Sequence, residues 1–309
     1  MANFIIEDLK RLFARGGHMI SRLLVINIIA FVFFNLLALY DPTTMEGTLR
    51  KYVGLPANLL DALLFFWTHI TYMFTHLSFG HILWNMIYLY FFGRILEDFV
   101  GSRTVLAVYL LSGLVGGWAY ILVENLGVLA GIPYFSAQAT LIGASGAVTG
   151  IMAAAATLTP EYTLRLFIIG NVRLKYLVLV LIVISSLLDL WSNTGGKIAH
   201  LGGAFMGYYF IRQRQLGNDL GRYPLYVVDL LAALLKPKSN MRVAHRKKSA
   251  AKSRKGAAKS NKKNVPVQDN GNDRQRKIDA ILDKISKSGY DSLTKAEKEF
   301  LFKVSKESD

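Results

Sequence analysis

Long apolar runs, separated by short polar or basic stretches, constrain the fold of this chain more than any other feature. A helix that spans a bilayer needs ~20 mostly apolar residues. Six segments meet or approach that length: residues 23–40, 81–99, 104–126, 145–159, 174–191 and 198–212. Hydrophobic residues make up 52% of the 309 positions, which is high for a soluble domain of this size. The sequence therefore predicts an all-α polytopic membrane protein whose core, residues 23–214, is a six-helix transmembrane bundle.

Segments 145–159 and 198–212 differ from the others because they are short and rich in Gly and Ala. Small residues let helix backbones approach closely, so this composition suits helices surrounded by other helices. We expect these two segments at the centre of the bundle.

Basic residues orient the predicted bundle, because cytoplasmic loops of membrane proteins carry an excess of Lys and Arg. With six spans, most basic residues near the helix ends fall on one side: Lys10, Arg11, Arg15, Arg22, Arg94, Arg103, Arg165, Arg173, Lys175, Arg212 and Arg214. The opposite side carries Arg50, Lys51 and Lys197. The pattern predicts a multi-pass protein of the cell membrane with both termini in the cytoplasm.

Two segments on the N-terminal side of the chain are apolar without being clean spans. Residues 1–22 are amphipathic and are predicted to lie along the membrane surface. Residues 41–80 are rich in aromatic residues but too interrupted for a seventh span. We predict a structured loop in the interface there, with Trp67 and Tyr72 at headgroup depth.

A basic linker and a helical hairpin follow the predicted bundle. Residues 215–271 form the linker, with a surface helix over 222–237, and twelve Lys or Arg with no acid lie between 236 and 263. Attraction to anionic lipid, at ~1 kcal/mol per basic residue, explains this charge better than nucleic-acid binding, because aromatic residues are not interleaved with it. Residues 272–309 show two apolar helical faces, and Thr294 with Glu297 forms a capping-box pair.

Four polar residues inside the predicted spans need a reason, since polar groups in a bilayer are costly. They are His81, Asn85, Ser145 and His200. Each falls near the non-cytoplasmic start of its helix, and His81 and Asn85 are four residues apart and share one face. Agreement in depth is what a shared site would produce.

Small residues around Ser145 and His200 predict that their helices touch. Gly143, Gly146 and Gly150 lie on one segment, and Gly203 and Gly207 lie on the other. Close packing would bring the Ser145 hydroxyl within reach of His200, which is the usual base for a serine nucleophile. The Ser145 N–H at the helix start, with His81 and Asn85, could stabilise an oxyanion. Asp189 is not tied to His200 by any pattern, so we predict a two-residue dyad that requires neither cofactor nor metal.

Over residues 20–212 the chain resembles the rhomboid intramembrane serine proteases. The resemblance rests on "HILWN" at 81–85, "GASG" at 143–146 and "AHLGGAFMG" at 199–207, in this order. It implies a serine endopeptidase that cuts transmembrane substrates, with an active site that opens toward the non-cytoplasmic side. It also implies Ser145 as nucleophile, His200 as general base and then acid, and the Ser145 N–H, His81 and Asn85 as the oxyanion hole.

The sequence departs from the family pattern at two positions. Many relatives carry Trp-Arg in the first long loop, whereas here Thr68 follows Trp67. Some relatives carry an aromatic residue four positions after the serine, which stacks on the histidine; here that residue is Thr149.

Other functions remain open on the sequence alone. A non-catalytic rhomboid-like protein that binds membrane clients would share the fold, though it would be free to lose Ser145 or His200. His81 and Asn85 could instead pin the first loop, while His69 and His76 are interpreted as interfacial anchors. A zinc site needs three close ligands, and no H-E-x-x-H motif occurs. A transporter is disfavoured because no acid lies in mid-span and no inverted repeat is apparent.

Overall fold

The computed structural model describes residues 17–40, 42–166, 170–187, 194–235 and 271–306. The chain divides into two compact units, residues 1–239 and 240–309, which are described separately. Most of the predicted N-terminal amphipathic segment and the basic stretch after residue 235 fall outside the described residues.

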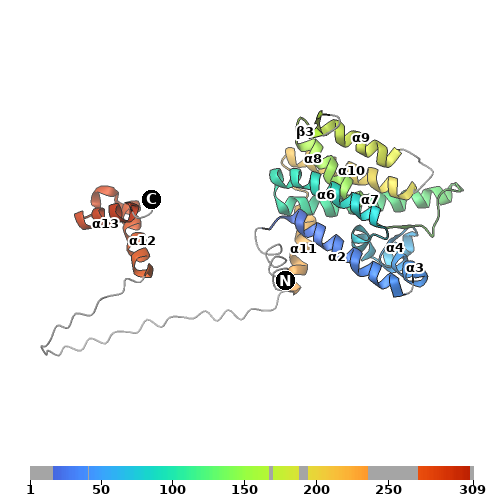
Figure 1. The fold of residues 1–309 in the computed structure, drawn as a ribbon, viewed down its shortest axis with the longest axis horizontal. Helices are drawn as coiled ribbons and strands as arrows, with labels where there is room; N and C mark the ends of the chain where they lie inside the picture. The colour runs from blue at the N-terminus through green and yellow to red at the C-terminus, as the bar shows by residue number, and fades with distance from the viewer. Residues whose placement is uncertain (1–16, 41, 167–169, 188–193, 236–270, 307–309) are drawn as a thin grey trace, which may run out of the picture. The chain divides into compact units, whose positions relative to one another are not determined.

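Six helices of the first unit occupy the six apolar segments (Figure 1). They are α2 (Met19–Tyr40), α6 (Phe79–Val100), α7 (Ser102–Leu129), α8 (Ser145–Leu158), α9 (Leu174–Leu187) and α10 (Thr194–Gln215). By length and composition, Met19–Leu37 and Ser102–Leu129 are the two described segments that pass a test for membrane spans. The mostly helical fold is confirmed, and the count of six spans stays a prediction.

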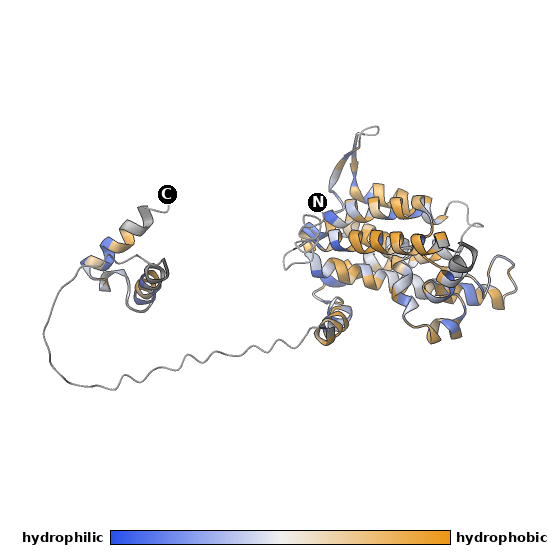
Figure 2. Cartoon of the chain, turned by 60° about the horizontal axis from the view of Figure 1, so that its bottom comes forward, coloured by the Kyte–Doolittle hydropathy of each residue, from blue (hydrophilic) through white to orange (hydrophobic). Residues whose placement is uncertain are grey.

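The exposed surface of this unit is strongly apolar. Apolar residues predominate along its long helices in Figure 2. On α2, Ile29 is 58% and Leu36 is 60% exposed, and on α9, Leu179 is 59% exposed. Contiguous exposed apolar faces of this kind suit contact with lipid.

Helix α2 begins at Met19, four residues before the predicted start at residue 23. The carboxylate of Glu97 on α6 accepts the main-chain N–H of Met19 and the hydroxyl of Ser102 at 2.6 Å. An acceptor from another helix therefore satisfies an N–H that the start of α2 leaves unpaired.

Residues 42–79 form the structured loop that the sequence predicts. It contains α3 (Pro42–Tyr52), β1 (Leu55–Pro56), α4 (Leu59–Leu64), α5 (Thr68–Thr71) and the 3-10 turn η1 (Tyr72–Phe74). Strand β1 pairs antiparallel with β2 (Thr140–Leu141), with Leu55 opposite Leu141. This pairing ties the loop to the residues just before α8.

The two aromatic residues expected at headgroup depth lie in different environments. Trp67 is 41% exposed, and its indole N–H donates to the Tyr52 carbonyl at 2.8 Å. Tyr72 is 1% exposed, and its hydroxyl donates to the Gly113 carbonyl on α7 at 2.6 Å. Tyr72 therefore packs inside the bundle, where its buried hydroxyl has a main-chain partner, and its depth relative to the headgroups stays a prediction.

Two further elements complete this unit. Strands β3 (Thr163–Leu166) and β4 (Gly170–Arg173) form a hairpin between α8 and α9. Helix α11 (Arg222–Leu235) occupies the predicted surface segment, and an ion pair of 2.6 Å between Arg103 and Asp229 joins it to the first turn of α7.

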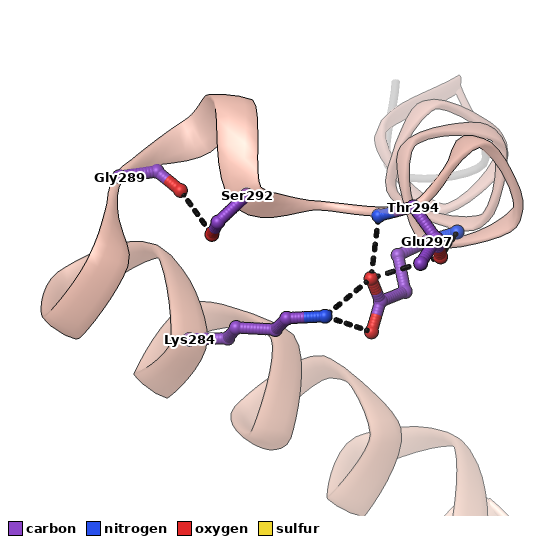
Figure 3. A network of polar contacts seen from close by, with 5 residues as sticks. All are labelled: Lys284, Gly289, Ser292, Thr294 and Glu297. Carbon is purple, nitrogen blue, oxygen red and sulfur yellow. Dashed lines mark hydrogen bonds and ion pairs between the residues drawn. The ribbon is translucent and has the colours of Figure 1, made fainter.

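The second unit contains α12 (Gly271–Ser288), η2 (Tyr290–Ser292) and α13 (Lys295–Lys306). Ile281 and Leu293 are its buried apolar residues among those described. The predicted capping box is present: the Thr294 N–H donates to Glu297 at 2.7 Å, and the Glu297 N–H donates to the Thr294 hydroxyl at 3.4 Å. Figure 3 shows that the Glu297 carboxylate also accepts a hydrogen bond from the ammonium of Lys284 on α12.

Candidate active site

A cavity of about 630 Å³ lies among α6, α8, α9 and α10. All four predicted polar residues line it: His81, Asn85, Ser145 and His200. Thr149 and Ser185 line it too, and among the described residues that line it Arg50 is the one lysine, arginine or acidic residue. The structure thus brings together the four predicted residues, of which His81 and His200 are farthest apart in the chain.

Ser145 is the first residue of α8, and the two residues before it are held by the first loop. The Gly143 N–H donates to the Tyr72 carbonyl at 2.9 Å, and the Ala144 N–H donates to His76 Nε2 at 3.3 Å. Gly143 has a φ of +114°, and a Cβ on it would lie 2.5 Å from the His81 ring. Glycine is therefore required there for the turn and for contact with His81, and not for contact between helices α8 and α10.

Helices α8 and α10 touch backbone to backbone. A Cβ on Gly203 would lie 1.9 Å from the Gly146 carbonyl oxygen, and one on Gly207 would lie 2.0 Å from that of Gly150. A Cβ on Gly150 would also meet the side chain of Ser112 on α7 at 2.1 Å. Side chains larger than hydrogen would separate α10 from α8, and His200 from the cavity that holds Ser145.

The ring of His200 is engaged by a third helix. Its Nδ1 lies 3.2 Å from the Ser185 carbonyl oxygen on α9. Within the part of the chain that the structure describes, no hydrogen bond joins the Ser145 hydroxyl to the His200 ring. Asp189, the carboxylate considered as a third triad member, lies outside the described residues.

His81 and Asn85 are adjacent on one face of α6, as their spacing predicts. The Asn85 amide donates one N–H to the His81 carbonyl at 2.9 Å, and a side-chain amide carries two N–H donors. The rings of His81 and His76 meet edge to face, with centroids 5.0 Å apart. His81 therefore contacts both the loop and the turn before Ser145, so a pinning role and an oxyanion role are compatible.

Sequence reasoning missed the contribution of His76. It was expected as an interfacial anchor, but it is fully buried and accepts the N–H of the residue before Ser145. Burial, with the neighbouring His81 second, lowers the pKa of His76 to about 3. A neutral His76 keeps the lone pair that Ala144 needs. The signal was a histidine in an apolar loop only five residues before His81.

Thr149 occupies the position where some relatives carry an aromatic residue. Its hydroxyl oxygen lies 2.9 Å from the Ser145 carbonyl, 3.0 Å from the Gly146 carbonyl and 3.1 Å from the His200 carbonyl. The sequence marked Thr149 as a departure but gave no sign that it contacts α10. Ser185 contacts His200 through its main-chain carbonyl. Every residue has such a carbonyl, so the residue type at position 185 could not predict this contact.

Two protein-family models match the chain. Residues 65–213 match the rhomboid domain, and residues 269–307 match a family of unknown function, DUF6576. The first match includes all four residues predicted for the site. The second covers α12 and α13.

Two curated relatives from Arabidopsis thaliana are similar over part of the chain. RHOMBOID-like protein 12, mitochondrial, is 36% identical over 146 residues, which cover 44% of this chain and 43% of the relative. RHOMBOID-like protein 5 is 28% identical over 143 residues, which cover 46% of this chain and 42% of the relative. The matched region thus spans less than half the length of either relative.

Proposed function

This chain belongs to the rhomboid family through the domain at residues 65–213, and we propose that it is an intramembrane serine endopeptidase. The observation that carries the proposal is that Ser145 and His200, on two helices in backbone contact, line one cavity. A nucleophile and a base on the same cavity is the minimum arrangement for acyl transfer.

The proposed reaction uses the residues of the cavity in fixed roles. His200 takes the proton of the Ser145 hydroxyl as the Ser145 oxygen attacks the peptide carbonyl carbon. The Ser145 N–H, His81 and Asn85 stabilise the negative oxygen that forms. The C–N bond then breaks, and His200 gives its proton to the leaving amine. His200 then takes a proton from water as the water oxygen attacks the acyl-enzyme carbonyl, the bond to the Ser145 oxygen breaks, and His200 returns the proton to that oxygen, which releases the carboxylic acid product and free Ser145.

The proposed substrates are transmembrane segments of other proteins. A regular helix buries its peptide bonds in hydrogen bonds, so a segment must unwind locally before it can be cut. We therefore expect cleavage near helix-weakening residues such as Gly in the substrate. The proposed orientation has six spans, both termini in the cytoplasm and the cavity opening toward the other side.

That orientation can be tested cleanly because the chain contains no Cys. Single cysteines are introduced by Pro133→Cys, between α7 and α8, and by Asn218→Cys, after α10. In intact cells a membrane-impermeant maleimide should label the first and not the second. Labelling of both or of the second alone contradicts the six-span orientation.

The proposed membrane is the cell membrane, as the basic residues indicate. One relative is described as mitochondrial, which makes an organelle membrane the alternative. Fluorescence microscopy of the tagged chain in its native cell decides between the two.

A lipid contact on the cytoplasmic side is also proposed. Helix α11 exposes an apolar stripe at helical spacing, formed by Tyr223, Tyr226, Val227, Leu230, Leu231 and Leu234. The twelve basic residues between 236 and 263 follow it directly in sequence. An apolar helix face next to a basic segment favours anionic lipid at the membrane surface. Hydrogen exchange over residues 222–235 should slow in nanodiscs with anionic lipid relative to zwitterionic lipid.

A second function is supported by one observation, the lack of a hydrogen bond between the Ser145 hydroxyl and the His200 ring in the described part of the chain. A rhomboid-like protein that binds membrane clients without cutting them would not need that bond. The same cavity and the same apolar surface would then hold a client segment.

Purified protein and a model transmembrane substrate in detergent separate the two functions. Ser145→Ala and His200→Ala should each lower the cleavage rate by ~10³-fold or more, because the serine and the histidine act as a unit and the loss of either one removes the activity of both. A serine-directed fluorophosphonate should label the wild type and not Ser145→Ala. Equal cleavage by all three proteins would exclude the protease assignment, and binding of the substrate without cleavage or labelling would support the client-binding function.

A further inference from the structure

We propose that His200 is positioned by two groups from neighbouring helices, the main-chain carbonyl of Ser185 and the hydroxyl of Thr149. Together they orient the imidazole ring and fix its tautomer, which is the role of the carboxylate in a catalytic triad. The proposal rests on the proposed function, since it assigns positioning residues to the same dyad. Neither group needs a charge, which suits a site built inside a helical bundle.

The Ser185 carbonyl reaches His200 from another helix. Ser185 lies on α9, Leu174–Leu187, and its carbonyl oxygen lies 3.2 Å from Nδ1 of His200 on α10. The main chain of α9 thus supplies an acceptor to the ring of His200.

That contact determines which ring nitrogen is basic. A carbonyl oxygen can only accept, so the hydrogen bond requires a proton on Nδ1 of His200. The other nitrogen, Nε2, then keeps its lone pair and is the atom that can take the Ser145 proton. When the ring becomes positive, the same carbonyl still accepts from Nδ1–H and stabilises the charge by its dipole.

Thr149 holds the main chain of the same residue. A threonine hydroxyl within a helix ordinarily bonds the carbonyl four residues earlier, and Thr149 lies 2.9 Å from that of Ser145. Its additional contact, 3.1 Å to the His200 carbonyl, crosses from α8 to α10. Thr149 is 5% exposed, so water competes little for this hydroxyl. One side chain therefore links the turn that begins with Ser145 to the backbone that carries His200.

The two contacts divide the positioning of His200 between them. The carbonyl of Ser185 sets the rotation and the tautomer of the ring, and the Thr149 hydroxyl fixes the His200 carbonyl against α8 where the glycine contacts have brought the two helices together. This arrangement replaces the stacking aromatic of some relatives, because Thr149 occupies the corresponding position.

A matched set of threonine variants tests the Thr149 contact. Thr149→Val keeps the shape and removes the hydroxyl, Thr149→Ser keeps the hydroxyl, and Thr157→Val is the control. Thr157 lies on the same helix and bonds the carbonyl four residues earlier at 2.7 Å, without the cross-helix contact. Thr149→Val should lower kcat by ~10- to 100-fold with KM little changed, because small displacements of catalytic groups cost rates of that size. Thr149→Ser should restore most of the rate.

Thermal unfolding separates positioning from general damage. If Thr149→Val and Thr157→Val lower the Tm equally while only Thr149→Val lowers kcat, the positioning role stands. If both variants lose kcat to the same extent, or Thr149→Val keeps the wild-type kcat, the role of Thr149 is overturned.

The Ser185 contact is tested by nitrogen-15 NMR of the histidine side chains, which does not depend on activity. The chain has six histidines, and His200→Gln identifies the signals of His200 by their disappearance. In wild-type protein at neutral pH, His200 should carry its proton on Nδ1. A His200 ring with the proton on Nε2 would overturn the role of the Ser185 carbonyl.

The outcomes also separate this inference from the proposed function. If wild-type protein cleaves and Ser145→Ala does not, the protease assignment stands whatever the Thr149 variants do. If no protein cleaves, the protease assignment fails, and the NMR result alone decides whether Ser185 orients the ring.

Discussion

Two glutamates tie helices together in this chain, one inside the membrane domain and one in the C-terminal hairpin. Glu97 accepts the Met19 N–H and the Ser102 hydroxyl, and its carboxylate also lies 3.5 Å from His18 and 3.9 Å from Arg94. Its side chain is 3% exposed. It holds the starts of α2 and α7 against the end of α6.

Glu297 has a similar set of donors in a different environment. It accepts the Thr294 N–H at 2.7 Å, the Thr294 hydroxyl at 2.9 Å and the Lys284 ammonium at 2.9 Å, as drawn in Figure 3. Its side chain is 29% exposed. It holds the start of α13 against α12.

The two glutamates differ in how well water can replace the carboxylate as an acceptor when the glutamate is removed. Around Glu297 water can bind the freed donors, whereas the Glu97 carboxylate is itself buried and its donors are partly buried, so water reaches them less easily. A substitution where α8 contacts α10 should cost more than either, because backbone atoms touch there and no side chain can move to relieve a clash. The expected effects of substitutions therefore fall in that order, from α8–α10 to Glu97 to the hairpin.

The largest effect is expected from Gly203→Ala. Its Cβ would lie 1.9 Å from the Gly146 carbonyl oxygen, so α10 must move away from α8. We expect a loss of about 3 kcal/mol in stability, at the upper end of overpacking costs, and loss of cleavage because His200 moves with α10. Thermal unfolding and the cleavage assay in detergent measure both.

Gly47→Ala is the control for that substitution. Nothing lies within 4 Å of a Cβ there, and Gly47 is inside helix α3. Alanine is a better helix former than glycine by up to about 1 kcal/mol, so this variant should be as stable as wild type or slightly more stable. A Gly203→Ala protein that matches Gly47→Ala in Tm would contradict the backbone contact between α8 and α10.

Sequence patterns predicted the features of both regions that depend on neighbouring residues. The apolar runs indicated the helices, and the spacing of Thr294 and Glu297 indicated the capping box, because its two partners lie three residues apart. The start of α2 at Met19 was missed because its acceptor, Glu97, lies 78 positions away. The burial of Tyr72 was not foreseen for the same reason, since its partner Gly113 lies 41 positions away.

The candidate site follows the same rule. Residue types and order brought Ser145, His200, His81 and Asn85 to notice, and the structure brings all four to one cavity. The contact of His76 with the Ala144 N–H and that of Ser185 with His200 depend on how separate helices pack. No local pattern encodes them.

Glu97→Ala should have the second largest effect. It leaves the partly buried Met19 N–H and Ser102 hydroxyl without their acceptor, which costs about 2 kcal/mol. Asp98→Ala is the matched control, because it removes the neighbouring carboxylate, which is exposed. Thermal unfolding in detergent should show a much larger loss for Glu97→Ala; equal Tm values for the two variants would remove the distinction between buried and exposed carboxylates.

Thr294→Ala should have a smaller effect confined to the hairpin. It removes the side-chain acceptor of the Glu297 N–H at the start of α13, and loss of such a cap costs about 1 kcal/mol. Hydrogen exchange measured on the full chain should become faster in α13 and stay unchanged in α8 and α10. Thr294→Ser keeps the hydroxyl and should restore the protection, and protection that Thr294→Ala leaves intact would show that the cap does not stabilise α13.

The smallest effect is expected from protonation of Glu297, which perturbs the hairpin without any substitution. The hydrogen bond from the Thr294 N–H, then that from Lys284, lowers its pKa from 4.5 to about 2. Between these two values the unfolded hairpin binds more protons than the folded one, so stability rises with pH across that window. The contribution of Glu297 is fully present above about pH 4.5 and is lost as the pH falls through about 2.

NMR titration of the Glu297 side chain in wild type and in Lys284→Met measures its pKa directly. The variant should titrate at a higher pH, because it lacks the Lys284 ammonium and keeps only the two Thr294 donors. An unchanged titration would mean that the ion pair with Lys284 of α12 does not affect the Glu297 carboxylate. Glu297 would then stabilise only the start of its own helix, α13, whereas Glu97 accepts hydrogen bonds from residues of two other helices.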